Sequence, residues 1–106
     1  MIIKIKDIYL YTGFTANAND GYSAKVWMDQ NNIQYTHMHY ADSAQHQSLF
    51  DALSTWSFGD AEIAFSQFPF VIYDEVSDDY SITKRCLYGL EAITSSDLVN
   101  LVAIGA

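Results

Sequence analysis

The first strand of the chain is predicted by a run of apolar and β-prone residues at positions 7–12, which is typical of a buried strand. This strand can begin earlier, because Ile3 and Ile5 alternate with polar residues. Their parity is opposite to that of Ile8, and successive residues of a strand point to opposite faces of its sheet. The pattern therefore predicts a β-bulge or a break near Lys6.

The spacing of apolar residues then changes from that of a strand to that of a helix. Residues 13–19 are small and polar and predict a loop. Asn19 or Asp20 can cap a helix that runs to about Gln30, because their side chains accept hydrogen bonds from free N–H groups of a first turn. The apolar stripe of this helix is Ala24, Trp27 and Met28.

A second strand and a second helix follow. Residues 33–40 predict the strand, and a strand, a helix and a strand joined by short loops form a βαβ unit with parallel strands. Asp42 or Ser43 is expected to cap the second helix, which reaches about Trp56. The apolar face of this helix is Leu49, Phe50, Leu53 and Trp56.

The second half of the chain begins with residues 57–67, which are either irregular or carry a short extended piece at 63–65. The single proline of the chain, Pro69, then opens an apolar run that predicts a strand to about Glu75. Proline has no N–H to donate to a sheet, so it belongs at the start of a strand, on an edge or at a bulge. It is also the residue at which a cis peptide bond is most accessible.

The last elements are a strand and a helix. Turn residues at 77–79 are followed by residues 82–88, which predict a strand antiparallel to the preceding one because the connection is short. Ser95 or Ser96 is expected to cap a final helix from Asp97 to about Val102, and Asp97 complements the helix dipole.

The resulting order, β-α-β-α-β-β-α with a proline before the third strand, resembles glutaredoxins and the wider thioredoxin fold over nearly the whole chain. The matching segments are Ala24-Lys25 to Ile33-Gln34-Tyr35, Phe68-Pro69-Phe70-Val71, and Leu87-Tyr88-Gly89 to Ser96-Asp97-Leu98. The resemblance implies a single α/β domain over residues 1–106, with a four-stranded mixed sheet flanked by three helices. It also implies a cis bond before Pro69.

The chain departs from this family at the positions that carry its chemistry. The family's Cys-x-x-Cys motif falls on Ala18-Asn19-Asp20-Gly21, and the one cysteine of the chain is Cys86. Thiol–disulfide exchange needs a thiolate, which alanine and glycine cannot supply. Gln67-Phe68 replaces the usual Thr-Val, and Ile93-Thr94 replaces the Gly-Gly pair beside which glutathione binds. Glutathione binding is therefore expected to be weak.

The composition of the chain excludes some classes of binding partner. The 106 residues carry 13 acidic and 5 basic side chains, a net charge of −8. Such a surface repels phosphate backbones and anionic lipids, so neither nucleic acid nor a membrane is an expected partner. No apolar run approaches the roughly 18–20 residues that span a bilayer. With one unpaired cysteine and no signal-peptide pattern, the sequence predicts a cytoplasmic protein.

The remaining candidates have ordinary structural explanations. His37 and His39 point to one side of a strand, about 7 Å apart, and His46 is a third imidazole, but a metal site needs three or four ligands and none is expected here. Cys86 is predicted to be a buried core residue. Core packing is also favoured over an exposed docking patch for five aromatic residues: Trp56, Phe58, Phe65, Phe68 and Phe70.

The leading hypothesis is a redox-inactive, glutaredoxin-like module without a cofactor that binds a protein or peptide in the groove beside Pro69. The residues assigned to this groove are Ala18, Asn19, Asp20, Gly21, Tyr22, Phe68, Pro69, Ser96 and Asp97. One alternative is a glutathione-dependent enzyme without a catalytic cysteine, in which Tyr11, Thr15 or Tyr22 steers the thiol. Another is a structural or assembly subunit, such as an accessory protein of a bacterial virus.

Overall fold

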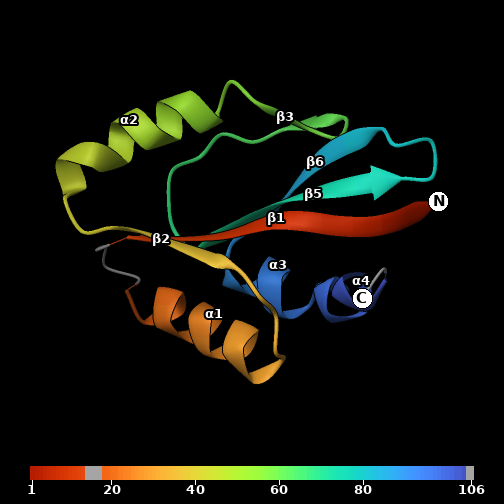
Figure 1. Ribbon diagram of the computed structural model, residues 1–106. Coiled ribbons are helices and arrows are strands. Elements are labelled where there is room, and N and C mark those ends of the chain that lie inside the picture. Colours follow the sequence, from red (N-terminus) through yellow and green to blue (C-terminus); the bar gives the residue numbers. More distant parts are fainter. Residues whose placement is uncertain (14–17, 105–106) are drawn as a thin grey trace.

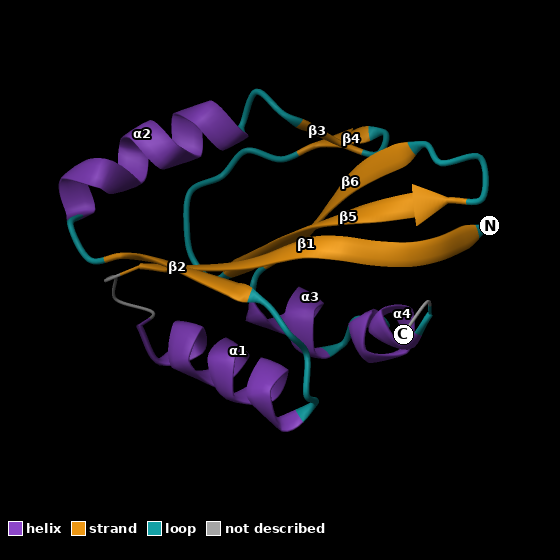
Figure 2. Ribbon diagram, in the orientation of Figure 1, coloured by secondary structure: helices purple, strands orange, loops and turns teal. Residues whose placement is uncertain are grey.

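The computed structural model describes residues 1–13 and 18–104. One four-stranded sheet, in the order β2-β1-β5-β6, separates α1, α3 and α4 on one face from α2 and a small hairpin on the other (Figures 1 and 2). The elements are β1 (Ile2–Gly13), α1 (Ala18–Gln30), β2 (Thr36–Tyr40), α2 (Ser43–Leu53), β3 (Ser57–Phe58), β4 (Ala61–Glu62), β5 (Phe70–Ser77), β6 (Ile82–Tyr88), α3 (Leu90–Thr94) and α4 (Leu98–Ala103).

The sheet is mixed, as the sequence predicts. β1 pairs with β2 in parallel and with β5 in antiparallel orientation, and β5 pairs with β6 in antiparallel orientation. The pairing of β1 with β5 shifts register between Lys6 and Tyr9, and Asp7 has a φ of 52°. The predicted irregularity near Lys6 is confirmed, and it explains how β1 keeps apolar residues of both parities buried.

The two faces of the sheet carry different cores. The face beneath α1, α3 and α4 is mainly aliphatic, and its fully buried members are Leu10, Ala24, Met28, Val71, Ile93 and Leu98. The opposite face is mainly aromatic and consists of Phe50, Leu53, Phe58, Phe65, Phe68, Phe70 and Ile72. The expected core packing is confirmed for Phe58, Phe65, Phe68 and Phe70. Trp56 is the exception, since it is 40% exposed and lies 5.5 Å from the Lys84 ammonium.

The predicted ends of the two long helices are only partly correct. α1 already begins at Ala18, so Asn19 and Asp20 lie within its first turn and neither precedes it. The prediction for α2 is confirmed at its start, where the Asp42 carboxylate accepts a hydrogen bond from the Ala44 N–H at 2.9 Å. Its predicted end at Trp56 is wrong, because the chain leaves the helix after Leu53.

The C-terminal region contains two short helices where the sequence predicts one, so four helices rather than three flank the sheet in the described chain. α3 was not predicted because five residues give no helical periodicity, although Ile93 within it is fully buried. Ser95 ends α3, and the Ser96 hydroxyl accepts a 3.4 Å hydrogen bond from the Leu98 N–H at the start of α4.

Smaller differences concern the loops. The predicted extended piece at 63–65 is wrong, because the β3–β4 hairpin lies at Ser57–Glu62 instead. The second strand starts at Thr36 rather than at Ile33, since the Ile33 N–H remains bonded to the Met28 carbonyl at the end of α1.

Candidate functional site

Phe68 and Pro69 lie directly before β5, and the peptide bond between them is cis. Phe68 is only 3% exposed, and Pro69 is fully buried. The Phe68 ring lies against Gly13 at the end of β1, where a Cβ atom would collide with it. These two residues are therefore interior, and their side chains are not a surface that a ligand can contact.

Ser96 and Asp97, the last two residues assigned to the groove, make local hydrogen bonds. The Ser96 hydroxyl donates to the Ile93 carbonyl at 2.6 Å, and the Asp97 carboxylate accepts from the Asn100 side chain at 2.6 Å. The first hydrogen bond closes the end of α3 and the second lies at the start of α4, so both are local interactions of a helix boundary.

Tyr22 is an exposed residue of the predicted groove. It lies on α1 close to Gly21, with 71% of its surface exposed. A hollow lies on each side of it. One opens toward β2, with a volume of about 190 Å³, and the other opens toward α3, with a volume of about 290 Å³. The hollow toward α3 is lined by Tyr22, Ser23, Val26, Trp27, Gln30 and Thr94.

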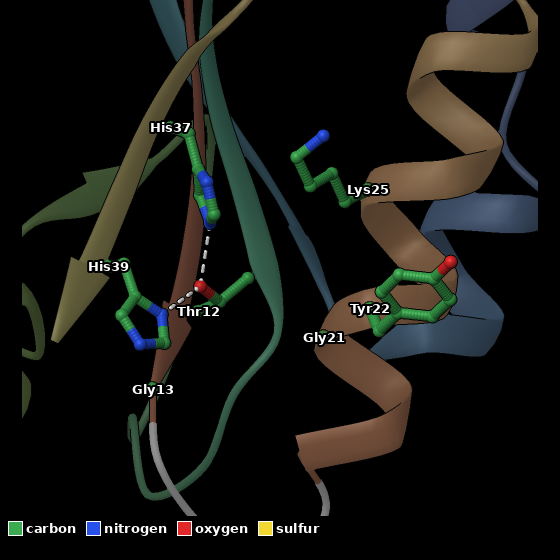
Figure 3. Close-up of a pocket in the computed structure, with 7 residues that line it drawn as sticks. All are labelled: Thr12, Gly13, Gly21, Tyr22, Lys25, His37 and His39. Atoms are coloured by element: carbon green, nitrogen blue, oxygen red, sulfur yellow. Dashed lines mark hydrogen bonds between the residues drawn. The ribbon is translucent and has the colours of Figure 1, made fainter. Parts of the chain in front are cut away.

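The hollow toward β2 contains a polar cluster that the sequence did not predict. The Thr12 hydroxyl oxygen lies 2.7 Å from Nε2 of His37 and 2.7 Å from Nδ1 of His39 (Figure 3). The parallel register places Thr12 opposite His39, so these side chains point to the same face of the sheet. The lining residues are Thr12, Gly13, Gly21, Tyr22, Lys25, His37 and His39.

Gly21 lets α1 approach this cluster closely. A Cβ atom at Gly21 would lie 3.3 Å from the Thr12 side chain, which is closer than most such contacts. The sequence offered little signal for Thr12, because a threonine near the end of a strand is common. The i, i+2 spacing of His37 and His39 was visible, but their shared partner depends on how β1 and β2 align.

The charges around the cluster are mostly paired. The Lys25 ammonium extends from α1 and contacts the Asp29 carboxylate at 2.8 Å. Hydrogen bonds from Lys25 and from the Tyr35 hydroxyl hold the pKa of Asp29 below its ordinary value. Burial lowers the pKa of His37, and the nearby His39 and Lys25 lower it further. The lowered pKa of His37 favours its neutral imidazole.

His46 does not join the other two histidines. Its Nε2 lies 2.7 Å from the Tyr40 carbonyl, and its ring packs on Phe68 beside the aromatic core. Across residues 1–13 and 18–104, no group of three or more His, Cys, Asp or Glu side chains is arranged to hold a metal ion.

The residues named for a glutathione-dependent enzyme are not brought together. Tyr11 stacks on Phe70 in the aromatic core, and burial raises its pKa, whereas Tyr22 projects from α1 on the other face of the sheet. Thr15 lies outside the described residues. Cys86 packs beside the aromatic core, where burial raises the pKa of its thiol to about 12.

Comparison with solved structures agrees with this architecture. The chain is similar to the crystal structure of glutaredoxin 1 from Francisella tularensis complexed with cacodylate, with a TM-score of 0.61 and 20% sequence identity. The alignment covers 86% of this chain and 90% of that one. The protein has a glutaredoxin-like thioredoxin fold. No family model and no curated protein matches the sequence of this glutaredoxin-like chain.

The four-stranded mixed sheet expected of a glutaredoxin-like protein is therefore confirmed. Within the described parts of the chain, none of the helices has the length and apolar character needed to cross a membrane.

Proposed function

We propose that this glutaredoxin-like chain is a redox-inactive binding module that contacts a protein or peptide through the surface around Tyr22. The proposal retains the first turns of α1, from Ala18 to Tyr22, as the contact region. It gives Phe68 and Pro69 the role of internal support. The exposed Tyr22 side chain between two hollows is the observation that carries it.

An exposed tyrosine of this kind suits a protein interface. Tyrosine presents a large, rigid and amphipathic side chain, and interface residues that dominate binding are enriched in Tyr, Trp and Arg. Hollows on both sides of Tyr22 would accept projecting side chains of the partner. The net charge of −8 favours a partner whose contacting surface is neutral or basic.

The lack of a second cysteine in the sequence supports binding over dithiol catalysis. By the sequence resemblance, the family's two cysteines correspond to Ala18 and Gly21, and the one thiol of this chain, Cys86, packs against the aromatic core on the opposite face of the sheet from α1. A thiol with a raised pKa is a poor nucleophile at neutral pH, because the thiolate is the attacking species.

The test is affinity capture from the organism that encodes the chain, with the wild type, Tyr22→Ala and Tyr80→Ala as baits. Tyr80 is a matched control, since it is 80% exposed and lies in the turn between β5 and β6. We expect a partner that wild type and Tyr80→Ala retain and Tyr22→Ala loses. Turnover of the wild type in a glutathione-dependent disulfide exchange or thiol-conjugation assay would instead support the enzyme alternative.

A further inference from the structure

The N-terminal half of β1 has a free edge. On one side β5 pairs with β1 from Ile2 to Tyr11, whereas on the other side β2 pairs only with the stretch from Tyr9 to Gly13 (Figure 1). In the described chain, residues 2–6 pair with β5 alone, and no backbone hydrogen bond from a loop or a turn reaches them. Alternate N–H and C=O groups of this segment therefore point away from β5, and such a row is a template for another strand. We propose that residues 2–6 bind an extended acidic segment of a partner protein, which adds a strand to this edge of the sheet.

A hollow of about 450 Å³ lies beside this edge, and its lining includes Ile5, Lys6, Asn32, Gln34 and Val102. The side chains of Asn32 and Gln34 are exposed. Each amide side chain has both donors and an acceptor, which suits the polar groups of a bound main chain. Ile5 and Val102 add apolar contacts. The hollow can therefore accept side chains of an added strand.

Two lysines on this segment have no carboxylate partner within the described part of the chain. The sequence has five basic side chains, and three of them contact a carboxylate at 2.8–2.9 Å, namely Lys25, Lys84 and Arg85. Lys4 and Lys6 take part in none of the ion pairs among residues 1–13 and 18–104. They are two residues apart on one strand, so they point to the same face of the sheet. They are therefore placed to pair with two carboxylates at the same spacing on an added strand.

The acidic groups near these lysines leave their charge available to a partner. Asp74 lies opposite Lys6 on β5 and is bound to Lys84 at 2.8 Å. Asp7 is exposed at the bulge, where regular pairing ends. A second copy that paired through the same edge would place its own lysines against Lys4 and Lys6, and like charges opposite each other destabilise a sheet. The charges thus favour a partner that carries carboxylates over a second copy of this chain.

The two faces of the sheet predict the sequence pattern of the bound segment. Ile5 packs in the aliphatic core beneath α1, α3 and α4, so Lys4 and Lys6 lie on the opposite face. An added strand meets the lysines with one set of alternate side chains and Val102 with the other set. The segment should therefore alternate acidic residues with apolar, β-branched residues.

The test is an NMR titration of the ¹⁵N-labelled chain with the acetylated and amidated peptide Glu-Val-Glu-Val-Glu-Val. We expect saturable shifts of the backbone amides at residues 2–6 and at Gln34. Lys4→Gln and Lys6→Gln should each weaken the affinity about two- to fivefold, because an exposed ion pair contributes modestly to binding. Lys25→Gln is the matched control. It removes the same charge from α1 and should leave the affinity unchanged.

Two N-methylated forms of the peptide test the backbone pairing. One is methylated on the glutamate nitrogens and the other on the valine nitrogens, so each form blocks one edge of the added strand. We expect one form to bind and the other to fail. Identical behaviour of the two forms, no saturable shift, or shifts confined to residues outside β1 would overturn the proposal. Self-association of the free chain that protects the amides of residues 2–6 would also overturn it, because a second copy would then occupy the edge.

This edge is separate from the surface around Tyr22. Tyr22 lies near the start of α1, whereas Asn32 follows the end of that helix. Tyr22→Ala should therefore bind the peptide as the wild type does. Failure of the peptide titration leaves the proposed role of Tyr22 unaffected.

Discussion

Replacing Phe68 with alanine is expected to lower the free energy of unfolding by about 4 kcal/mol. The side chain is 3% exposed, and its ring lies 4.9 Å from His46, 5.0 Å from Phe50 and 5.5 Å from Phe70, measured between centroids. Removing a buried phenylalanine typically costs about 3–5 kcal/mol. Phe68 also loses several aromatic contacts, each worth about 0.5–1.5 kcal/mol, so we expect a loss near the middle of that range rather than at its lower end.

Urea unfolding followed by far-UV circular dichroism measures this effect directly. A loss of about 4 kcal/mol is a large part of the roughly 5–15 kcal/mol that stabilises a typical domain, so the midpoint should fall sharply. Tyr80→Ala serves as the exposed control and should change the unfolding free energy by no more than about 0.5 kcal/mol. A loss below about 1 kcal/mol for Phe68→Ala, with an unchanged slope of the unfolding free energy against urea concentration, would show that Phe68 is not a core residue.

Two further predictions concern the thiol and a helix start. With a pKa of about 12, about one Cys86 thiol in ten thousand is ionised at pH 8, so a disulfide reagent should label it far more slowly in the folded than in the unfolded chain. Because burial raises this pKa from 9.0, the Cys86 contribution to stability is complete below pH 9 and should decline as pH rises toward 12. Equal labelling rates in the folded and the unfolded chain would refute the prediction that burial suppresses ionisation of the Cys86 thiol. In the same urea assay, Asp42→Ala should lower the free energy of unfolding by about 1 kcal/mol, and Asp42→Asn should lower it much less. Equal losses for the two variants would contradict the role of Asp42 as the N-cap of α2.

Much of the fold could be predicted because local patterns and long-range packing agree. The parity change before Ile8 predicted the bulge at which Asp7 adopts a positive φ. Asp42 was a recognisable cap because its chemistry acts within two residues. Helix α3 could not be predicted, because it has only five residues and the burial of Ile93 depends on tertiary contacts.

The candidate site was less predictable for the same reason. The sequence placed Tyr22 near the start of a helix, but its exposure depends on what packs against α1. Phe68 appeared suited to a groove, yet its ring fills the space above Gly13. The cluster at Thr12 requires the parallel register of β1 and β2, which no local pattern specifies.

The most direct test of the proposed function is the affinity of the captured partner for the purified wild type, Tyr22→Ala and Tyr80→Ala, measured by calorimetry. If Tyr22 dominates the interface, its truncation should cost about 2 kcal/mol, or about 30-fold in Kd. Tyr80→Ala should bind within about twofold of the wild type. Equal affinities for the wild type and Tyr22→Ala would contradict the proposal that the surface around Tyr22 is the binding site.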